Sequence, residues 1–299
     1  MRPSLTSEEI RWLECAARMG RAGAAEAQPL HGTQAGRAFI GRGAGGDRTM
    51  QIDLACENAM VEVLRRDAPA PFSLVSEELG YAGAEDAPWR VVLDPLDGSL
   101  NAKRGLKTFA ASIAIADGGR MADVRIAHVD DYVHSETFTA VRGAGLLQLA
   151  VEDSRIESEF TDESRFETDS IEVLLLEAGR PDRHDFPYQD LRKISGSNTG
   201  ADMRVRQIGS LALALCYVAV GVGDVLLAAV QSRSVDVAAG LLILQEAGGG
   251  AASLSGGNLM EQPLDLEKRC AFVAWRRGLD GEEIVRRARE VPGFALDKC

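Results

Sequence analysis

The hydrophobic and polar positions along the chain predict strands that alternate with helices. Short, continuous apolar runs, typical of buried strands, lie at 72–75, 91–93, 109–116, 124–129, 171–176 and 224–230. Two segments read as helices, 50–64 from apolar residues at helical spacing and 210–220 because it is apolar almost throughout. Strands and helices in alternation are typical of a layered arrangement, in which helices cover the faces of a sheet.

Residues that favour helix termini mark where several helices begin and end. Thr6 and Glu9 have the spacing of a capping box, in which each side chain bonds a backbone N–H of the other residue. We expect Asp236 to be the N-cap of a helix that ends just before Gly248. The last helix, predicted over 280–291, is basic and amphipathic, which is typical of a solvated face.

The strand at 91–93 is followed at once by Asp94, Pro95, Leu96, Asp97 and Gly98. Pro95 fixes φ and removes a backbone donor, so the chain turns, and Gly98 allows a ligand to approach the backbone closely. Both carboxylates and the Leu96 carbonyl can then point into one small volume. Two anions so close need a positive partner, and a hard divalent cation is the simplest one. The alternative is an ordinary acidic turn, and this stretch alone leaves the two interpretations even.

Two other segments also place acids beside apolar elements. Glu77 and Glu78 follow the run at 72–75, so a second strand ends in carboxylates. Asp236 stands directly before an apolar helical segment. Together with Asp94, these acids provide the oxygen ligands that Mg²⁺ and Mn²⁺ prefer. The combination favours a divalent-cation site over a solvated turn.

Three segments of the chain resemble the signature segments of the inositol monophosphatase and fructose-1,6-bisphosphatase superfamily of metal-dependent phosphatases. They are Glu77-Glu78, WRVVLDPLDGSLN at 89–101 and SVDVAAGLLILQEAGG at 234–249. Asp53 and the segments 128–145 and 205–224 agree with the resemblance, which covers about residues 46–275. It implies an α+β fold, a layered αβαβα sandwich of the sugar-phosphatase type.

The chain is expected to divide into two halves. An N-terminal α+β half, 1–168, would carry Glu77 and the DPLDGS segment, and a C-terminal α/β half, 169–299, would carry Asp236. The polar stretch 152–169 is typical of a hinge between them.

The resemblance implies two or three Mg²⁺ ions per site, with Mn²⁺ able to substitute. Glu77, Asp94 and the Leu96 carbonyl would hold the ion that activates water. Asp94, Asp97 and Asp236 would hold the ion at the leaving group, so that Asp94 bridges the two. A phosphate monoester would then be hydrolysed by direct attack of the activated water.

The resemblance also assigns residues around the metals. Catalytic roles fall to Glu77, Ser99 and Asp53, and substrate binding to Asp97, Gly98, Ser99, Gly209 and Ser210. The Ser99 hydroxyl would accept a proton from the attacking water and so orient it, while N–H groups at Gly98 and Ser99 would receive the phosphate. For Asp53 the sequence alone favours a helix-surface carboxylate, whereas the resemblance implies an outer metal ligand or a water-holding group.

The expected substrate is a small sugar or polyol phosphate, namely inositol 1-phosphate, fructose 1,6-bisphosphate or both. The segments SEELG and DGSLNAKRG most resemble archaeal and bacterial members that accept both compounds. Members that prefer inositol phosphates commonly have an acid where this chain has Ala229. Relatives are usually homodimers. The alternatives are a phosphatase of the 3′-phosphoadenosine nucleotidase type and a non-catalytic, metal-binding relative.

Other classes of acidic site fit the spacing less well. DPLDGS does not follow the calcium pattern D-x-D-x-D-G, and Gly105 stands where an EF-hand needs Glu. A phosphatase that forms an aspartyl-phosphate would want acids at i and i+2, but Asp94 and Asp97 are at i and i+3.

Composition narrows the partners and the location. The chain has 33 Lys and Arg against 45 Asp and Glu, a net charge of −12, which argues against nonspecific nucleic-acid binding and means that an anionic substrate needs a metal to enter. The five scattered cysteines lack CxxC spacing, so we expect buried thiols in a reducing cytoplasm. The pattern predicts neither a signal peptide nor a membrane span.

Two further features receive no catalytic role. The Gly-rich segment 32–46 predicts a mobile loop rather than a phosphate-binding loop, since it lacks the Lys and the strand-to-helix context; in the resembling family this segment moves near the metals. Four arginines could meet a second phosphate or a sugar, but a solvated surface is the default for Arg180, Arg183, Arg204 and Arg206.

Overall fold

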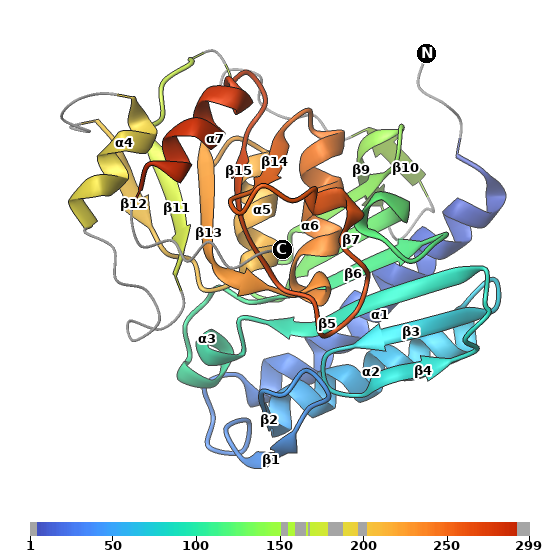
Figure 1. Cartoon of the computed structure of the whole chain (residues 1–299). Coiled ribbons are helices and arrows are strands. Elements are labelled where there is room, and N and C mark those ends of the chain that lie inside the picture. The colour runs from blue at the N-terminus through green and yellow to red at the C-terminus, as the bar shows by residue number, and fades with distance from the viewer. Residues whose placement is uncertain are drawn as a thin grey trace.

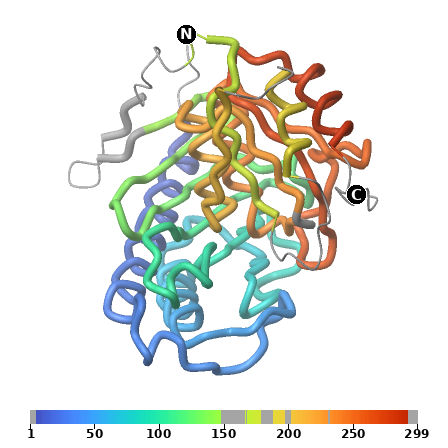
Figure 2. The backbone as a smooth tube through the Cα atoms, turned by 90° about the vertical axis from the view of Figure 1, so that its left-hand side faces the viewer, coloured from blue at the N-terminus to red at the C-terminus, as the bar shows by residue number. Residues whose placement is uncertain are grey.

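Helices and sheets stack in five layers, in the order α–β–α–β–α, in this computed structural model (Figure 1). The structure describes residues 5–150, 155–158, 166, 168–178, 188–196 and 202–291. The predicted αβαβα sandwich is confirmed. Seen from the side, the early part of the chain and the late part occupy opposite ends of the molecule (Figure 2).

The first helical layer consists of α1 (Ser7–Leu30) and α2 (Gln51–Asp67). Thr6 is the N-cap of α1, and its Oγ1 accepts a hydrogen bond from the Glu9 N–H at 3.1 Å. The Glu9 carboxylate accepts in return from the Thr6 N–H at 2.9 Å, so the predicted capping box is confirmed.

The larger sheet has eight strands among the described residues, in the order β10-β9-β8-β7-β6-β5-β3-β4. They are β3 (Phe72–Ser76), β4 (Gly80–Gly83), β5 (Trp89–Asp97), β6 (Ala110–Ala116), β7 (Val124–Asp131), β8 (Thr137–Val141), β9 (Gly145–Ala150) and β10 (Arg155–Ser158). β3 runs parallel to β5, and the other neighbours are antiparallel. Val91 and Leu93 pack with α1 and α2, whereas Val92 packs with α6 on the opposite face. Both faces are covered, which explains the continuous apolar run.

The central layer consists of α5 (Leu211–Ala219) and α6 (Ser234–Glu246), which lie between the two sheets. The smaller sheet has the order β12-β11-β13-β15-β14: β11 (Val173–Glu177), β12 (Arg204–Arg206), β13 (Val225–Ser232), β14 (Gly250–Ser253) and β15 (Cys270–Trp275). One apolar core joins Val92 of the larger sheet, Leu242 of α6 and Phe272 of the smaller sheet. The division at 168 and 169 stays a prediction, since this core is shared.

Two helices cover the outer face of the smaller sheet, α4 (Arg192–Ser195) and α7 (Gly281–Arg289). The remaining helix, α3 (Ser99–Arg104), follows β5 directly, and short 3₁₀ helices span Met121–Asp123, Tyr188–Leu191 and Leu259–Glu261. Within the described ranges, no helix combines the length and apolar character that a membrane crossing requires.

Three local expectations are wrong. The strand at 91–93 does not stop before Asp94, because β5 continues to Asp97 with a shift in its register to β6 between these two residues. The N-cap of α6 is Arg233, and Asp236 lies in the first turn, where its carboxylate accepts from the Arg233 N–H at 2.9 Å. The Gly-rich segment is not loop throughout, since β1 (Phe39–Arg42) and β2 (Arg48–Met50) form an antiparallel pair there.

The cysteines agree only in part with the expectation of buried free thiols. Cys15, Cys56 and Cys216 are buried free thiols. Cys270 is disulfide-bonded, so the expectation of thiols throughout is wrong at this position. Cys299 lies outside the described residues.

Candidate metal centre

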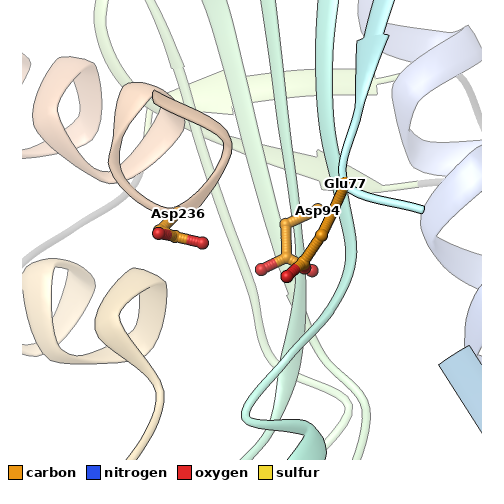
Figure 3. A group of neighbouring side chains, drawn as sticks. All are labelled: Glu77, Asp94 and Asp236. Atoms are coloured by element: carbon orange, nitrogen blue, oxygen red, sulfur yellow. The ribbon is translucent and has the colours of Figure 1, made fainter. Parts of the chain in front are cut away.

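Three carboxylates from three different elements converge on one point (Figure 3). Glu77 follows the last residue of β3, Asp94 lies within β5, and Asp236 lies in the first turn of α6. Each offers an oxygen atom, and these atoms all lie within 4.8 Å of one another. The parallel register pairs Ser76 with Leu93, so the next residue of each strand, Glu77 and Asp94, comes out side by side.

Burial and mutual repulsion make this cluster costly without a cation. Asp94 is only 2% exposed, and burial, followed by the charges of Glu77 and Asp97, raises its pKa well above the usual carboxyl range. Burial also raises the pKa of Glu77, although the Arg233 guanidinium opposes the shift. A divalent cation would remove the repulsion, and an all-oxygen ligand set suits Mg²⁺ or Mn²⁺. The residues therefore fit the metals that the sequence predicts.

Asp97 lies beside this cluster and is held by the C-terminal part of the chain. Its Oδ2 accepts a hydrogen bond from the Ser210 hydroxyl at 2.7 Å and from the Ala212 N–H at 2.6 Å. Burial and the Asp236 charge nevertheless raise the pKa of Asp97 to about 8. The structure places Asp97 within electrostatic reach of Asp236, but outside the group of three. Its role as a metal ligand stays a prediction.

The turn after Asp94 is braced by two short-range hydrogen bonds. Asp94 Oδ1 accepts from the Leu96 N–H at 2.9 Å. The Ser99 hydroxyl donates to the Leu96 carbonyl oxygen at 2.9 Å. Because its proton is engaged there, Ser99 Oγ presents lone pairs to any further partner. This is the arrangement expected of an oxygen that accepts a hydrogen bond from water.

Asp53 is a buried residue of α2, so the helix-surface interpretation is wrong. The residue is 1% exposed, and its Oδ2 accepts from the Met50 N–H at 2.8 Å. Burial raises the pKa of Asp53, and the hydrogen bond from the Met50 N–H partly opposes this. The other oxygen, Oδ1, is buried with no hydrogen-bond partner in the described part of the chain. Such an orphaned acceptor fits a water or a cation ligand.

The predicted substrate-binding residues come together from two distant segments of the chain, 97–99 and 209–210. Gly98 has φ +96°, and a Cβ there would lie 3.2 Å from the Gly209 carbonyl oxygen, so only glycine permits this approach. The Asn101 side chain donates to the Ile208 carbonyl at 2.9 Å and so holds the two segments together. The Gly209 N–H donates to Glu177 at 2.8 Å and is not free for a phosphate.

Sequence reasoning missed the most direct neighbour of the cluster, Arg233. This residue is 6% exposed, and its Nη2 donates to Glu77 Oε1 at 2.5 Å and to Asp236 Oδ1 at 3.2 Å. The sequence signal that could have indicated this contact is an arginine three residues before Asp236, at the start of a predicted helix. Glu78, which the sequence groups with Glu77, lies outside the group of three acids; it accepts from the Thr49 hydroxyl, and burial raises its pKa to about 7.

The four arginines without an expected role stay without one. Arg204 and Arg206 are exposed on β12, and each donates to the carbonyl of the preceding residue. Arg180 and Arg183 lie outside the described residues.

The sequence and the fold were compared with those of known proteins. The sequence model of the Inositol monophosphatase family matches residues 14–291. "Fructose-1,6-bisphosphatase/inositol-1-monophosphatase" of Methanothermobacter thermautotrophicus is 31% identical over 279 residues, 90% of this chain and 93% of that protein. "Nus factor SuhB" of Pasteurella multocida is 35% identical over 218 residues, 71% of this chain and 74% of that protein. The solved structure of the extragenic suppressor protein suhB from Bartonella henselae superposes with a TM-score of 0.72 at 22% identity, covering 93% of this chain and 98% of that one.

Proposed function

The chain belongs to the inositol monophosphatase family, and from this membership we propose that it is a Mg²⁺-dependent phosphomonoesterase for a small sugar or polyol phosphate. The observation that carries the proposal is the convergence of Glu77, Asp94 and Asp236 within 4.8 Å. A chain that had lost the activity would be expected to have lost at least one of these acids.

The proposed roles follow from where each side chain lies. Glu77, Asp94 and the Leu96 carbonyl would hold one cation, and Asp94, Asp97 and Asp236 another. When bound, such ions lower the pKa of a water and neutralise charge on the phosphate. Ser99 Oγ, whose proton is directed at the Leu96 carbonyl, would accept a hydrogen bond from the attacking water and so orient it.

Two other groups complete the proposed site. Asp53 Oδ1 is buried and unpartnered in the described structure, close to Ser99, and would hold a second water or an outer cation. Gly98 lets the backbone at the start of α3 approach the phosphate, next to Gly209 and Ser210. The water attacks phosphorus directly, because the i, i+3 spacing of Asp94 and Asp97 does not suit a phosphoenzyme.

Inositol 1-phosphate and fructose 1,6-bisphosphate are the proposed substrates. The name of the Methanothermobacter relative covers both activities. Ala229 is 2% exposed on β13 and puts no charge where inositol-preferring members commonly have an acid, which is compatible with a broad preference. The homodimer and the cytoplasmic location stay predictions.

The test is hydrolysis by the purified protein of inositol 1-phosphate, fructose 1,6-bisphosphate and a 3′-phosphoadenosine nucleotide. We expect phosphate release from the sugar or polyol esters with Mg²⁺ or Mn²⁺, and none after exhaustive chelation. Asp86→Asn, in an exposed turn, is the matched control for Asp94→Asn. Release that persists without metal, or only from the nucleotide, would contradict the proposal.

A further inference from the structure

Arg233 places a fixed positive charge inside the carboxylate cluster. Its Nη2 lies 2.5 Å from Glu77 Oε1 and 3.2 Å from Asp236 Oδ1, and its Nε lies 3.3 Å from Asp236 Oδ2. Glu77 and Asp236 are two of the three residues whose oxygens could hold a metal. The guanidinium thus uses the carboxylates on which a divalent cation also depends.

The same side chain is covered by the segment between β1 and β2. Arg233 Nη1 donates to Asp47 Oδ2 at 3.1 Å. A Cβ on Gly45 would lie 2.4 Å from Nη1, so the backbone of this segment lies directly on the guanidinium. The Gly45 N–H donates to the Glu77 carbonyl at 2.8 Å, which fixes the segment in place. Arg233 is therefore enclosed, and its charge is hardly screened by solvent.

A guanidinium and a divalent cation cannot both bind the same carboxylates at full strength. Burial disfavours the charge of Arg233, but the charges of Asp236 and Glu77 outweigh it and raise its pKa, so it remains a cation. A metal that reaches Glu77 must displace Nη2 or bear the repulsion of an adjacent positive charge. We propose that Arg233 is a built-in competitor for the divalent cation at the Glu77 and Asp236 side of the site.

The inference rests on the metal site of the proposed function and adds a determinant of its cation affinity. In the metal-free protein Arg233 balances charge that would otherwise be repulsive. When a cation binds, Arg233 leaves Glu77 and stays with Asp47 on the covering segment. An ion pair with a purely structural role differs from this, because its loss would lower stability without improving metal binding.

The experiment titrates Mg²⁺ and Mn²⁺ alone into metal-free protein by calorimetry, with thermal melts in parallel. We expect Arg233→Gln to bind the ions at least about tenfold tighter than wild type, because the competing charge is gone. Its melting temperature without metal falls, and the rise on metal addition is larger than in wild type. Arg233→Met, which keeps most of the buried volume, gives the same readout if the Gln variant does not fold.

Two controls separate charge from local disturbance. Arg233→Lys keeps a positive charge, so its metal affinity stays near that of wild type. Arg269→Gln removes a donor to the Gly45 carbonyl, 3.3 Å away, without touching the carboxylates, and leaves the affinity unchanged. Equal or weaker metal binding by both neutral variants overturns the inference. Metal binding is measured without substrate, so the two proposals can fail separately. If the neutral variants bind metal more tightly but the protein hydrolyses no phosphate ester, this inference holds and only the proposed function is wrong.

Discussion

The Ser99 hydroxyl donates a hydrogen bond to the carbonyl oxygen of Leu96, with 2.9 Å between the two oxygen atoms. This bond fixes the rotamer of Ser99 and directs the lone pairs of Oγ away from the Leu96 carbonyl. The carbonyl keeps a second lone pair, which a cation can use. The two groups expected to serve the water and the metal therefore position each other.

Replacing Ser99 with Ala tests this arrangement. We expect kcat to fall by about 10²–10⁴ while KM changes little, because only the orienting contact is lost. Ser99→Thr keeps the hydroxyl and is expected to stay near wild type. If Ser99 only caps a turn, the Ala variant will instead melt at a lower temperature with normal turnover per folded molecule. Steady-state kinetics and thermal melts of both variants decide between these outcomes.

Asp94→Asn is expected to abolish metal-dependent hydrolysis, because an amide cannot replace the charge that bridges two cations. The fold should survive. Asp94 is buried and repelled by Glu77 and Asp97, so its neutralisation is expected to leave the metal-free melting temperature unchanged or higher. A variant that keeps hydrolysing phosphate esters would remove Asp94 from the centre. Circular dichroism before and after chelation provides the check on folding.

Stability should depend on pH in opposite ways without and with metal. The pKa of Asp97 rises from an ordinary value of 3.8 to about 8 on folding, so its folded form binds the proton more tightly. A group with a raised pKa stabilises the fold below its unfolded pKa and loses this contribution as pH rises through the folded value. The free energy of unfolding of metal-free protein is thus expected to fall between about pH 4 and pH 8. Urea unfolding at several pH values measures it.

Saturating Mg²⁺ should reverse this trend, because the cation binds the ionised carboxylates of the native state and not the unfolded chain. Asp97→Asn in metal-free protein is the matched control and should flatten the slope. A slope that is unchanged in this variant would assign the pH dependence to other groups.

Asn101→Ala is expected to weaken the contact between the two halves. The side chain is 7% exposed, and its Nδ2 donates to the carbonyls of Thr108 and Ile208 at 2.7 and 2.9 Å. The Ile208 carbonyl keeps the Thr108 hydroxyl as a donor at 3.0 Å, so loss of the Asn101 hydrogen bonds is expected to cost about 0.5–1.5 kcal/mol. We also expect KM to rise, since Gly209 is no longer held against Gly98. Asn258→Ala, an exposed helix cap elsewhere, should leave KM unchanged.

Those parts of the site that depend on strand register could be predicted from sequence. Two apolar runs that each end in acids predict adjacent carboxylates, and the parallel pairing of β3 and β5 puts Glu77 beside Asp94. The predicted end of β5 is wrong, because this strand stays paired with β6 as far as Asp97. The pairing continues through a shift in register that no local sequence pattern reveals. The burial of Asp53 could not be predicted from the sequence either, since it depends on how α2 packs on the larger sheet.

Arg233 shows where local reasoning fails. As a sequence feature it is one arginine before a helix, and surface solvation is the usual expectation for that residue type. Its enclosure results from Asp47 and Glu77, which lie far away in the chain. Only the assembled structure brings these groups together.

The three acids of the candidate cation centre lie just after β3, within β5 and in α6, and α6 comes late in the chain. During synthesis, a ribosome that has released only the larger sheet presents Glu77 and Asp94 without Asp236. A cation that depends on all three acids would therefore find its site incomplete until α6 has been added. Such a cation would hold the C-terminal part of the finished chain to the N-terminal part, and it would stabilise only chains that have been completed through α6.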